Sequence, residues 1–521
     1  MASVPDLDAL RELDPGAQTA RLDDPLRAGL FRWTAGDHRA QLARDQFSGR
    51  FVASRKLAAT QGAWVRQGTV LTPEMFGARP GQADHTVHLH ALFDQVEPGM
   101  RLQLNGRYML SRGITVARKA GFAVEGRGTI VMRSGVPVAH GFWMLYFIDC
   151  ADFQLSSLTF DANRAGRVPR EVPAHSINFQ SCRQFTCSGV RSLNAVCDGF
   201  ILFSATPAQP ETHCREFRFV DCVGDNCYRQ GCSIIEGHDG LFSGGAFTHT
   251  NGTAPAAGID LESDPGAPPG AISDIVVRNV HFAGNHGYGL LVSTVARPSD
   301  IVVEDCRFED NRAGAISWGA TSGRISRVTI SGFAPTATRG AIDVPAGDGL
   351  RQEVGITIEA LRFSRVTTAR ADHPLVYVHS AAFGPVRIVA LEADACGAIA
   401  GLNRDGSSLE GATISASLGT VDGAISVSGR GCTLLRNRVE RFFGSVIVAT
   451  GSDVVVRSNT LSMPRFNDSN GVVRILAPGA IIEDNVIQGA RDMVGIRLAQ
   501  AARTLRNNRV TGFLRTIADR T

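Results

Sequence analysis

The stretch APAAGIDLES, residues 254–263, decides the fold of this chain. At its centre Ile259 and Leu261 alternate with Asp260 and Glu262, and a period of two is typical of a half-buried β-strand. We expect the two apolar side chains to face the interior and both carboxylates to stand on the outer face. Because two acids on one open face repel each other, the pair indicates a site that uses them.

The same strand pattern recurs along the chain. A small residue, mostly Gly, followed by an apolar run appears again about every 20 to 32 residues, which is the period of a solenoid. These copies begin at Gly199, Gly231, Gly289, Gly314, Gly340, Gly397, Gly423, Gly444, Gly471 and Gly495. Further strands with polar corners, such as residues 274–285 and 300–311, lie between the copies, and no helical period intervenes. The pattern therefore predicts an all-β fold, a right-handed parallel β-helix whose coils bury their faces by stacking.

Composition bounds the class of protein. The chain has 521 residues, which would suggest several domains, but a solenoid grows by adding coils. The net charge is +3 without a basic run, so we expect no nucleic-acid partner, and no apolar stretch is long enough to cross a membrane. The first residues lack a basic start and an apolar core, so no Sec signal is visible. We expect a cytoplasmic protein or export by a non-Sec route.

The chain contains 11 cysteines, an odd number, and eight of them lie between Cys150 and Cys232. No CxxC pair is present, and several cysteines sit in or beside apolar strands. Free cysteine behaves as a small buried apolar residue, so we interpret the set as thiols stacked in the core, with disulfides or a metal as the alternatives.

Residues 1–72 lack the β-helix rhythm, and we expect them to form a small N-terminal module or cap. Residues 71–81, LTPEMFGARPG, precede a helix expected near 86–96, and residues 73–521 form the predicted β-helix. This segment resembles the start of the β-helix in the pectate-lyase-like superfamily, which includes phage tailspikes. The short helix would cover the open end of the solenoid, where strand groups are otherwise unpaired. Its three histidines, at 85, 88 and 90, are interpreted as solvated helix positions and not as metal ligands.

The richest polar region runs from Gly224 to Tyr288. It contains NCYRQG at 226–231, NGTAP at 251–255 and GIDLE at 258–262. This succession is similar to bacterial and phage β-helix proteins associated with polysaccharide processing. The resemblance implies an enzyme that acts on carbohydrate, and it does not fix the reaction.

Aligning the coils by their glycines places Arg229 on one side of the acidic pair and His286 with Tyr288 on the other. Carboxylates, a guanidinium, an imidazole and a phenol supply the acid and base groups that sugar cleavage needs. The candidate catalytic residues are Asp260, Glu262, Arg229, His286 and Tyr288. The candidate substrate-binding residues are Tyr228, Gln230, His238, Asp239, His249 and Trp318, with Trp318 as an exposed aromatic surface for a sugar ring.

Three classes of function stay open on these residues. A glycoside hydrolase is favoured over elimination by a small margin. A uronate lyase or C5-epimerase is the first alternative: the epimerase strand Tyr-Gly-Phe-Asp-Pro-His shares Gly258 and Asp260 with this chain, whereas Ala257 and Glu262 replace its Tyr and His. A non-catalytic, spike-like carbohydrate-binding protein is the second alternative.

We expect no cofactor, although a structural Ca²⁺ at the acidic pair is an alternative interpretation, because carboxylates and turn carbonyls suit that ion. The expected partner is a polysaccharide or oligosaccharide. We also predict a homo-oligomer, and specifically a trimer. The strands of the last coil have unpaired backbone groups along one edge, and another subunit could cover that edge. The resemblance to tailspikes points the same way.

Overall fold

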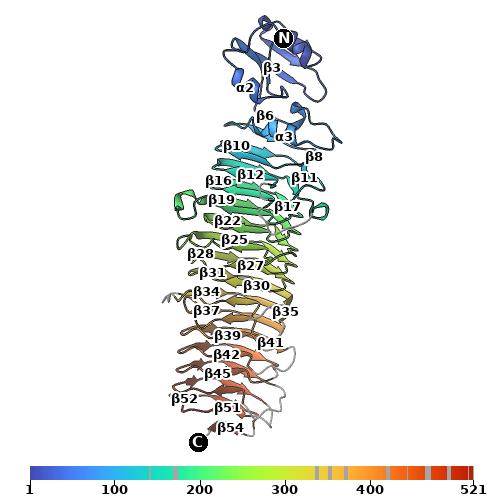
Figure 1. The fold of residues 1–521 in the computed structure, drawn as a ribbon. Helices are drawn as coiled ribbons and strands as arrows, with labels where there is room; N and C mark the ends of the chain where they lie inside the picture. Colours follow the sequence, from blue (N-terminus) through green and yellow to red (C-terminus); the bar gives the residue numbers. More distant parts are fainter. Residues whose placement is uncertain are drawn as a thin grey trace. The chain divides into compact units, whose positions relative to one another are not determined.

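The computed structural model describes residues 1–139, 142–167, 174–334, 340–349, 355–368, 373–417, 423–442, 444–463, 471–489, 494–513 and 515–519. The chain divides into two compact units, and Figure 1 labels their helices and strands. The first unit comprises residues 1–205 and 212–228, and the second comprises residues 206–211 and 229–521.

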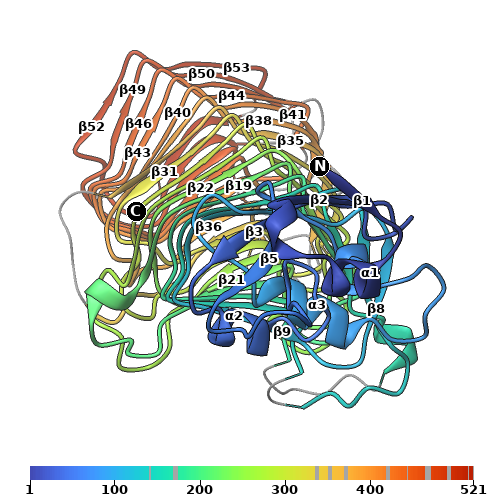
Figure 2. The same cartoon turned by 90° about the horizontal axis from the view of Figure 1, so that it is seen from above.

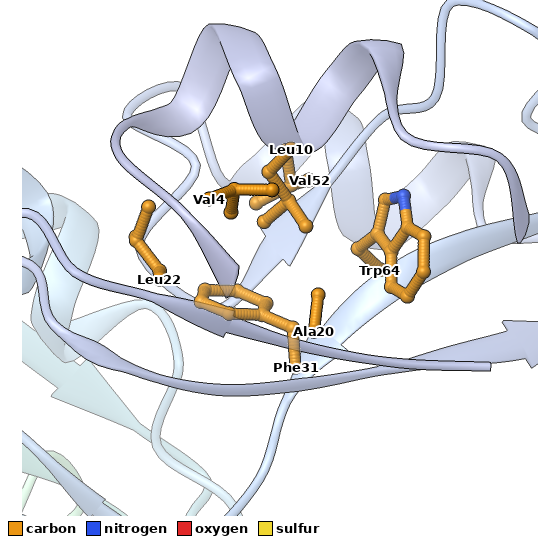
Figure 3. Packing of buried hydrophobic residues seen from close by; sticks show 7 residues of the cluster. All are labelled: Val4, Leu10, Ala20, Leu22, Phe31, Val52 and Trp64. Atoms are coloured by element: carbon orange, nitrogen blue, oxygen red, sulfur yellow. The ribbon is translucent and has the colours of Figure 1, made fainter. Parts of the chain in front are cut away.

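The first unit begins with a small mixed sheet and two short helices, α1 (Leu7–Glu12) and α2 (Arg39–Arg44). The strand order is β1-β2-β3-β5-β4, with bounds Ala2–Val4, Thr19–Leu22, Gly29–Ala35, Gly62–Arg66 and Phe51–Val52. Its core gathers side chains from the sheet and from α1, as Figure 3 shows for Val4, Leu10, Ala20, Leu22, Phe31, Val52 and Trp64. The interior of this part is therefore apolar and closed.

Helix α3 (Thr86–Phe93) comes next and is shorter than the predicted 86–96. Short 3₁₀ helices lie at Pro15–Ala17, Pro73–Phe76, Arg164–Gly166 and Pro210–Thr212. The prediction of solvated histidines at this helix is wrong. His85 is buried, its Nδ1 accepts a hydrogen bond from the Met109 amide at 3.0 Å, and His88 Nδ1 lies 2.9 Å from the Phe76 carbonyl oxygen. These histidines fix the helix against neighbouring backbone.

Three parallel sheets form the rest of the first unit. One contains β6 (Val70–Leu71), β7 (Arg101–Gln103), β10 (Ala120–Glu125), β13 (Ala151–Ser156), β16 (Arg183–Ser188) and β19 (Cys214–Val220). The second contains β8 (Arg107–Leu110), β11 (Thr129–Met132), β14 (Thr159–Asp161), β17 (Arg191–Leu193) and β20 (Val223–Asp225). The third contains β9 (Ile114–Ala117), β12 (Leu145–Ile148), β15 (Ile177–Gln180) and β18 (Phe200–Phe203).

The second unit repeats the same three-sheet plan. Its first sheet contains β22 (Gly237–Ser243), β25 (Ile272–Arg278), β28 (Ser299–Glu304), β31 (Gly323–Ser326), β34 (Ile356–Glu359), β37 (Val386–Val389), β40 (Ser408–Glu410), β43 (Thr433–Leu435), β46 (Val455–Arg457), β49 (Ile481–Glu483) and β52 (Thr504–Arg506). Its second sheet contains β23 (Ala246–Thr248), β26 (His281–Ala283), β29 (Arg307–Glu309), β32 (Thr329–Ala334), β35 (Arg362–Thr368), β38 (Glu392–Cys396), β41 (Thr413–Ser417), β44 (Arg438–Glu440), β47 (Thr460–Ser462), β50 (Val486–Gln488) and β53 (Arg509–Thr511).

The third sheet of the second unit carries the acidic strand. It contains β21 (Cys232–Ile234), β24 (Ile259–Leu261), β27 (Tyr288–Val292), β30 (Gly314–Trp318), β33 (Ile342–Val344), β36 (Val376–Val378), β39 (Ala400–Leu402), β42 (Ile425–Val427), β45 (Ile447–Ala449), β48 (Val473–Ile475), β51 (Val494–Leu498) and β54 (Arg515–Asp519).

Within the second unit, β24, β27 and β30 pair in parallel with the equivalent strand of the next coil, and Figure 2 shows the coils of this unit stacked on one another. Like side chains therefore stack at equal register: Ile259, Leu290, Ile316 and Ile342 form one continuous buried row. Asparagines stack in the same way at a corner, where the Asn285 Nδ2 donates to Asn311 Oδ1 at 2.8 Å. The predicted right-handed parallel β-helix is confirmed.

The prediction for the cysteines is also confirmed. All eleven are free and buried. Burial raises the pKa of Cys222, Cys227 and Cys306 to about 12, because the thiolate would lose its hydration. These thiols are core residues.

Candidate functional site

Asp260 lies in the middle of β24, on the outer row of the sheet, between Ser233 and Leu291 of the neighbouring coils. The prediction that its carboxylate faces solvent is wrong, because Asp260 is only 2% exposed. Its Oδ2 accepts a hydrogen bond from Gln230 Nε2 at 2.7 Å, and Gln230 Oε1 accepts one from the Ala257 amide, also at 2.7 Å. The side chain of Gln230 thus links the acid to the backbone of its own coil.

Glu262 is the partner predicted for Asp260. It comes directly after the end of β24, where its amide still donates to the Ile234 carbonyl at 3.1 Å, and it is half-buried. Of the predicted pair, Glu262 is therefore the carboxylate that solvent reaches.

A third acid, Glu236, was not predicted. It is fully buried and lies two residues after Ile234, which pairs with Leu261. By register it stands level with Ser263, one residue beyond Glu262. A weak signal existed in the sequence, since an acid comes after the apolar run that begins at Gly231.

The register places Arg229 and Tyr288 earlier along their coils than Asp260. Cys232, Ile259 and Leu290 are aligned, so Tyr288 is level with Ala257, and Arg229 stands one residue further back. Both are half-buried. They precede the level of Asp260 by three or four residues, as Gln230 does, and the side chain of Gln230 still reaches Asp260. A place for Arg229 and Tyr288 beside the acidic pair stays a prediction.

His286 and Tyr288 form a separate polar group in the next coil. His286 is exposed, and its Nε2 lies 3.4 Å from Arg312 Nη1. The ring of Tyr288 lies over Gly314, where an added Cβ would approach the ring within 2.8 Å. An imidazole, a guanidinium and a phenol therefore stand near one another on the surface of the second unit.

The remaining predicted binding residues are dispersed. His238 and Asp239 were expected in a turn but belong to β22, in a different sheet from Asp260, and His238 Nδ1 lies 3.0 Å from Ser273 Oγ. His249 is exposed after β23 and packs over Gly284 of the next coil. Gln230 is fully buried, so it is a support for Asp260 and no surface contact for a substrate.

The prediction for Trp318 is wrong as well. Trp318 is 1% exposed, lies level with Val292 and is among the largest fully buried side chains. The glycine alignment counted from Gly314, but Ile316 pairs with Leu290, so the true register is shifted by one residue at this coil. That shift turns the indole into the core.

Tyr228 lies in the first unit, where a polar groove of about 290 Å³ runs along the corner after β14, β17 and β20. The guanidinium of Arg164 lies 5.0 Å from the centre of the Tyr228 ring. Asn194 Nδ2 donates to Asp161 Oδ1 at 2.9 Å, and Asn226 Nδ2 donates to Asn194 Oδ1 at 2.7 Å. Burial lowers the pKa of Arg164. An amide and carboxylate row beside an aromatic ring is a surface suited to sugar hydroxyls.

The sequence prediction also missed a buried cluster in the first unit. His175 Nδ1 lies 3.0 Å from Asp198 Oδ2, and Cys197 Sγ lies 3.8 Å from Asp198 Oδ1. Burial lowers the pKa of His175, but the charge of Asp198 outweighs this effect and raises it to about 10. Both residues stand in the short segments before β15 and β18, which the sequence identified only as strand starts.

Comparison with known proteins identifies the fold. No family model and no curated protein matches this chain. Among solved structures, the pre-mature gene product 12 of bacteriophage phi29 is similar with a TM-score of 0.51 and 13% identity, over 83% of this chain and 57% of that one. In the part of the chain that the structure describes, no helix is long and apolar enough to span a membrane.

Two tailspikes are similar at lower scores. The enzymatically active domain of tailspike protein 4 from bacteriophage CBA120 gives a TM-score of 0.46 and 11% identity, over 84% of this chain and 53% of that one. The tailspike gp49 of Acinetobacter baumannii bacteriophage Fri1, a capsular polysaccharide depolymerase, gives 0.42 and 12%, over 98% and 76%. The chain thus spans between about half and three quarters of the length of these three proteins. What the likeness to phi29 gene product 12 shows is a shared parallel β-helix fold.

Proposed function

We propose that this protein binds a polysaccharide and cleaves it by hydrolysis, with Asp260 and Glu262 as the carboxyl pair. One observation carries the proposal: the carboxylate of Asp260 is kept 2% exposed on the outer row of the sheet and is held by Gln230. Burying a carboxylate costs folding free energy, and such costs are often retained where a site uses the group. The half-buried Glu262 stands two residues further along the chain.

The spacing of the two acids suits an inverting mechanism. Side chains two residues apart on a strand have Cβ atoms about 6.6 to 7 Å apart. Inverting glycosidases separate their carboxyl groups by about 6.5 to 9.5 Å, to admit a water molecule, whereas retaining enzymes need about 5 to 5.5 Å. We therefore assign inversion of the anomeric centre.

The two acids would have different roles. Asp260 accepts a hydrogen bond from Gln230, which fixes the orientation of its carboxyl group, and we assign it as the base that activates water. Glu262 is assigned as the acid that protonates the leaving oxygen, because solvent and substrate can reach it directly. Since Asp260 is buried, this assignment requires that substrate binding opens a path for the attacking water.

The groove beside Tyr228 supports the carbohydrate part of the proposal. Its carboxylate and amide groups from Asp161, Asn194 and Asn226 can bind sugar hydroxyls. Arg164, which also lines the groove, adds a guanidinium that lies over the Tyr228 ring. We assign this groove to polysaccharide binding in the first unit, without a catalytic role.

A second reaction is favoured by a separate observation, the approach of Arg312 to His286 at 3.4 Å near Tyr288. In a uronate polysaccharide, a guanidinium would neutralise the carboxylate while an imidazole removes the adjacent proton. This group therefore supports elimination as the alternative chemistry, at a different place from the carboxyl pair.

A product assay separates the two reactions. The wild-type protein is incubated with a panel of neutral and acidic polysaccharides, including capsular ones, and the products are tested for new reducing ends and for the ultraviolet absorbance of an unsaturated uronate. Hydrolysis predicts reducing ends without that absorbance. The absorbance would select elimination, and chains of unchanged length across the panel would contradict cleavage and leave binding alone.

A further inference from the structure

Three potential metal ligands of different chemistry meet inside the first unit. They are the imidazole of His175, the thiol of Cys197 and the carboxylate of Asp198, and each offers one ligand atom within 4.8 Å of the other two. All three residues are buried. The polysaccharide site proposed above uses none of them.

The strand register explains why they meet. Ile177 of β15 pairs with Phe200 of β18, so His175 and Asp198, each two residues earlier, occupy equivalent positions in adjacent coils. The Ser176 amide donates to the Asp198 carbonyl at 2.9 Å and ties the two segments together. The cluster therefore rests on backbone pairing and does not depend on a flexible loop.

The Nδ1 atom of His175 lies close to a carboxylate oxygen without a hydrogen bond to it. Nδ1 of His175 lies 3.0 Å from Asp198 Oδ2, yet it forms no hydrogen bond of acceptable geometry with any residue in the described part of the chain. A buried ring nitrogen without a hydrogen bond is costly, and such an atom is accounted for if it binds an ion.

The distances also suit a tetrahedral ion. Zinc binds nitrogen and oxygen at about 2.0 Å and sulfur at about 2.3 Å, which places neighbouring ligand atoms about 3.3 to 3.6 Å apart. The observed separations of 3.0 Å from Nδ1 to Oδ2 and 3.8 Å from Sγ to Oδ1 lie on either side of this range. Small shifts of the side chains would bring the three atoms to bonding distance from one ion.

The surroundings are those of a built site. Val138, Ala174 and Val196 form a buried apolar cluster, and Ala174 and Val196 directly precede His175 and Cys197 in the sequence. The side-chain Nδ2 of Asn178 donates to the His175 carbonyl at 3.2 Å and helps to fix the backbone of the ligand. Apolar packing and fixed ligands both favour the capture of a metal ion.

We propose that His175, Cys197 and Asp198 bind one Zn²⁺ ion, or another divalent ion of similar size that accepts thiolate, imidazole and carboxylate ligands. Binding releases the protons of the thiol and the imidazole and leaves one position of a tetrahedral shell for a further ligand. The ion would clamp two adjacent coils of the first unit, so its role is structural and separate from the carboxyl pair.

Cobalt titration tests the proposal. The full chain, kept reduced and stripped with a chelator, is titrated with Co²⁺, a zinc substitute whose thiolate complexes absorb light by sulfur-to-metal charge transfer. We expect one equivalent per chain, a charge-transfer band that Zn²⁺ abolishes, and a higher Tm after Zn²⁺ is added. A folded wild-type chain that binds no Co²⁺, or binds it without the band, would overturn the proposal and leave an ion pair of His175 with Asp198.

Matched variants locate the site. Cys197→Ser should lose the band and weaken metal binding by about 10-fold or more. Cys222→Ser, which changes another buried thiol of the same unit, should keep both. Persistence of the band in Cys197→Ser would also overturn the proposal. If Cys197→Ser does not fold by circular dichroism, Asp198→Asn replaces it, and its expected result is the same weakening of metal binding.

Discussion

Two coils of the second unit have strands of nearly the same sequence, and they differ in the residues that follow the strand. Residues 258–262 read GIDLE, and residues 340–345 read GAIDVP. Asp260 and Asp343 both lie between buried apolar residues on the outer row of the same sheet, and they are 2% and 6% exposed. The two coils differ just beyond the strand, because a carboxylate stands two residues after Asp260 and a proline stands two residues after Asp343.

This comparison distinguishes features that the fold alone can produce from features that indicate a functional site. A parallel β-helix can bury an aspartate on its outer row at more than one coil, so burial alone does not identify a catalytic acid. Asp260 is distinguished by Glu262 and by the hydrogen bond from Gln230. The proposed chemistry depends on that combination.

The largest expected effect comes from removing the second carboxylate. Glu262→Gln should lower turnover of the cleaved polysaccharide by about 10² to 10⁴-fold, the range found for a general acid, with little change in stability because the side chain is half-buried. Glu392→Gln, which changes an exposed acid paired with Arg362, should leave turnover within a few-fold. The rates are measured by release of reducing ends. Equal rates for the two variants would mean that the coil of Asp260 has no more catalytic role than the coil of Asp343.

A second prediction tests β30, in one of the two coils between the two aspartates. Trp318 is buried in β30, so Trp318→Ala should destabilise the protein by about 3 to 5 kcal/mol through the cavity that it creates. Urea unfolding at a fixed protein concentration measures the change, with Tyr288→Ala as a half-buried control that should cost less. An unchanged unfolding midpoint together with a raised KM would instead restore the expectation of an exposed sugar platform.

A third prediction sharpens the comparison at Gln230. Gln230→Ala removes a hydrogen bond to a carboxylate, a loss of about 1.5 to 3 kcal/mol in the free energy of unfolding. In a double-mutant cycle, the effect should shrink when Asp260 is also replaced by Ala, because the acceptor is then absent. Full additivity would show that Gln230 supports the coil without acting on Asp260.

The smallest expected effect concerns Asp84, a half-buried acid in the first unit. Desolvation raises the pKa of Asp84, but hydrogen bonds from Ser111, Thr86 and Arg133 outweigh it and lower the pKa to about 2, from 3.8. A lowered folded-state pKa contributes stability above about pH 4, and this contribution is lost as the pH falls towards 2.

Because the Asp84 side chain is still 35% exposed and solvent screens its interactions, its contribution should stay below about 1 kcal/mol. The Tm difference between wild type and Asp84→Asn should therefore be small at pH 5 and smaller still at pH 3. A difference that grows as the pH falls would contradict the direction of the pKa shift.

The sequence predicted the fold because its signals are repetitive. The apolar period of two and the recurring glycines appear in many successive coils. An error in the interpretation of one coil therefore does not change the predicted fold. The buried cysteines were predicted by the same reasoning, and the helix before the first coils was predicted with an end three residues too late.

The site was less predictable because it depends on the register between neighbouring strands and on which outer side chains are buried by their surroundings. Counting from Gly314 misplaced Trp318 by one residue, and a shift of one residue exchanges the core and the surface. Alternation placed Asp260 on the outer row correctly, but it could not show that the acid is covered there. The cluster of His175, Cys197 and Asp198 was missed because residues of adjacent coils meet only once the pairing of β15 with β18 is known.

The most direct test of the carboxyl-pair proposal compares the two buried aspartates in one experiment. Asp260→Asn and Asp343→Asn are purified alongside the wild type, shown to be folded, and assayed for new reducing ends on the polysaccharide that the wild type cleaves. We predict a loss of about 10² to 10⁴-fold for Asp260→Asn and turnover within a few-fold of wild type for Asp343→Asn. Near-wild-type turnover in Asp260→Asn would contradict the assignment of Asp260 as the catalytic base.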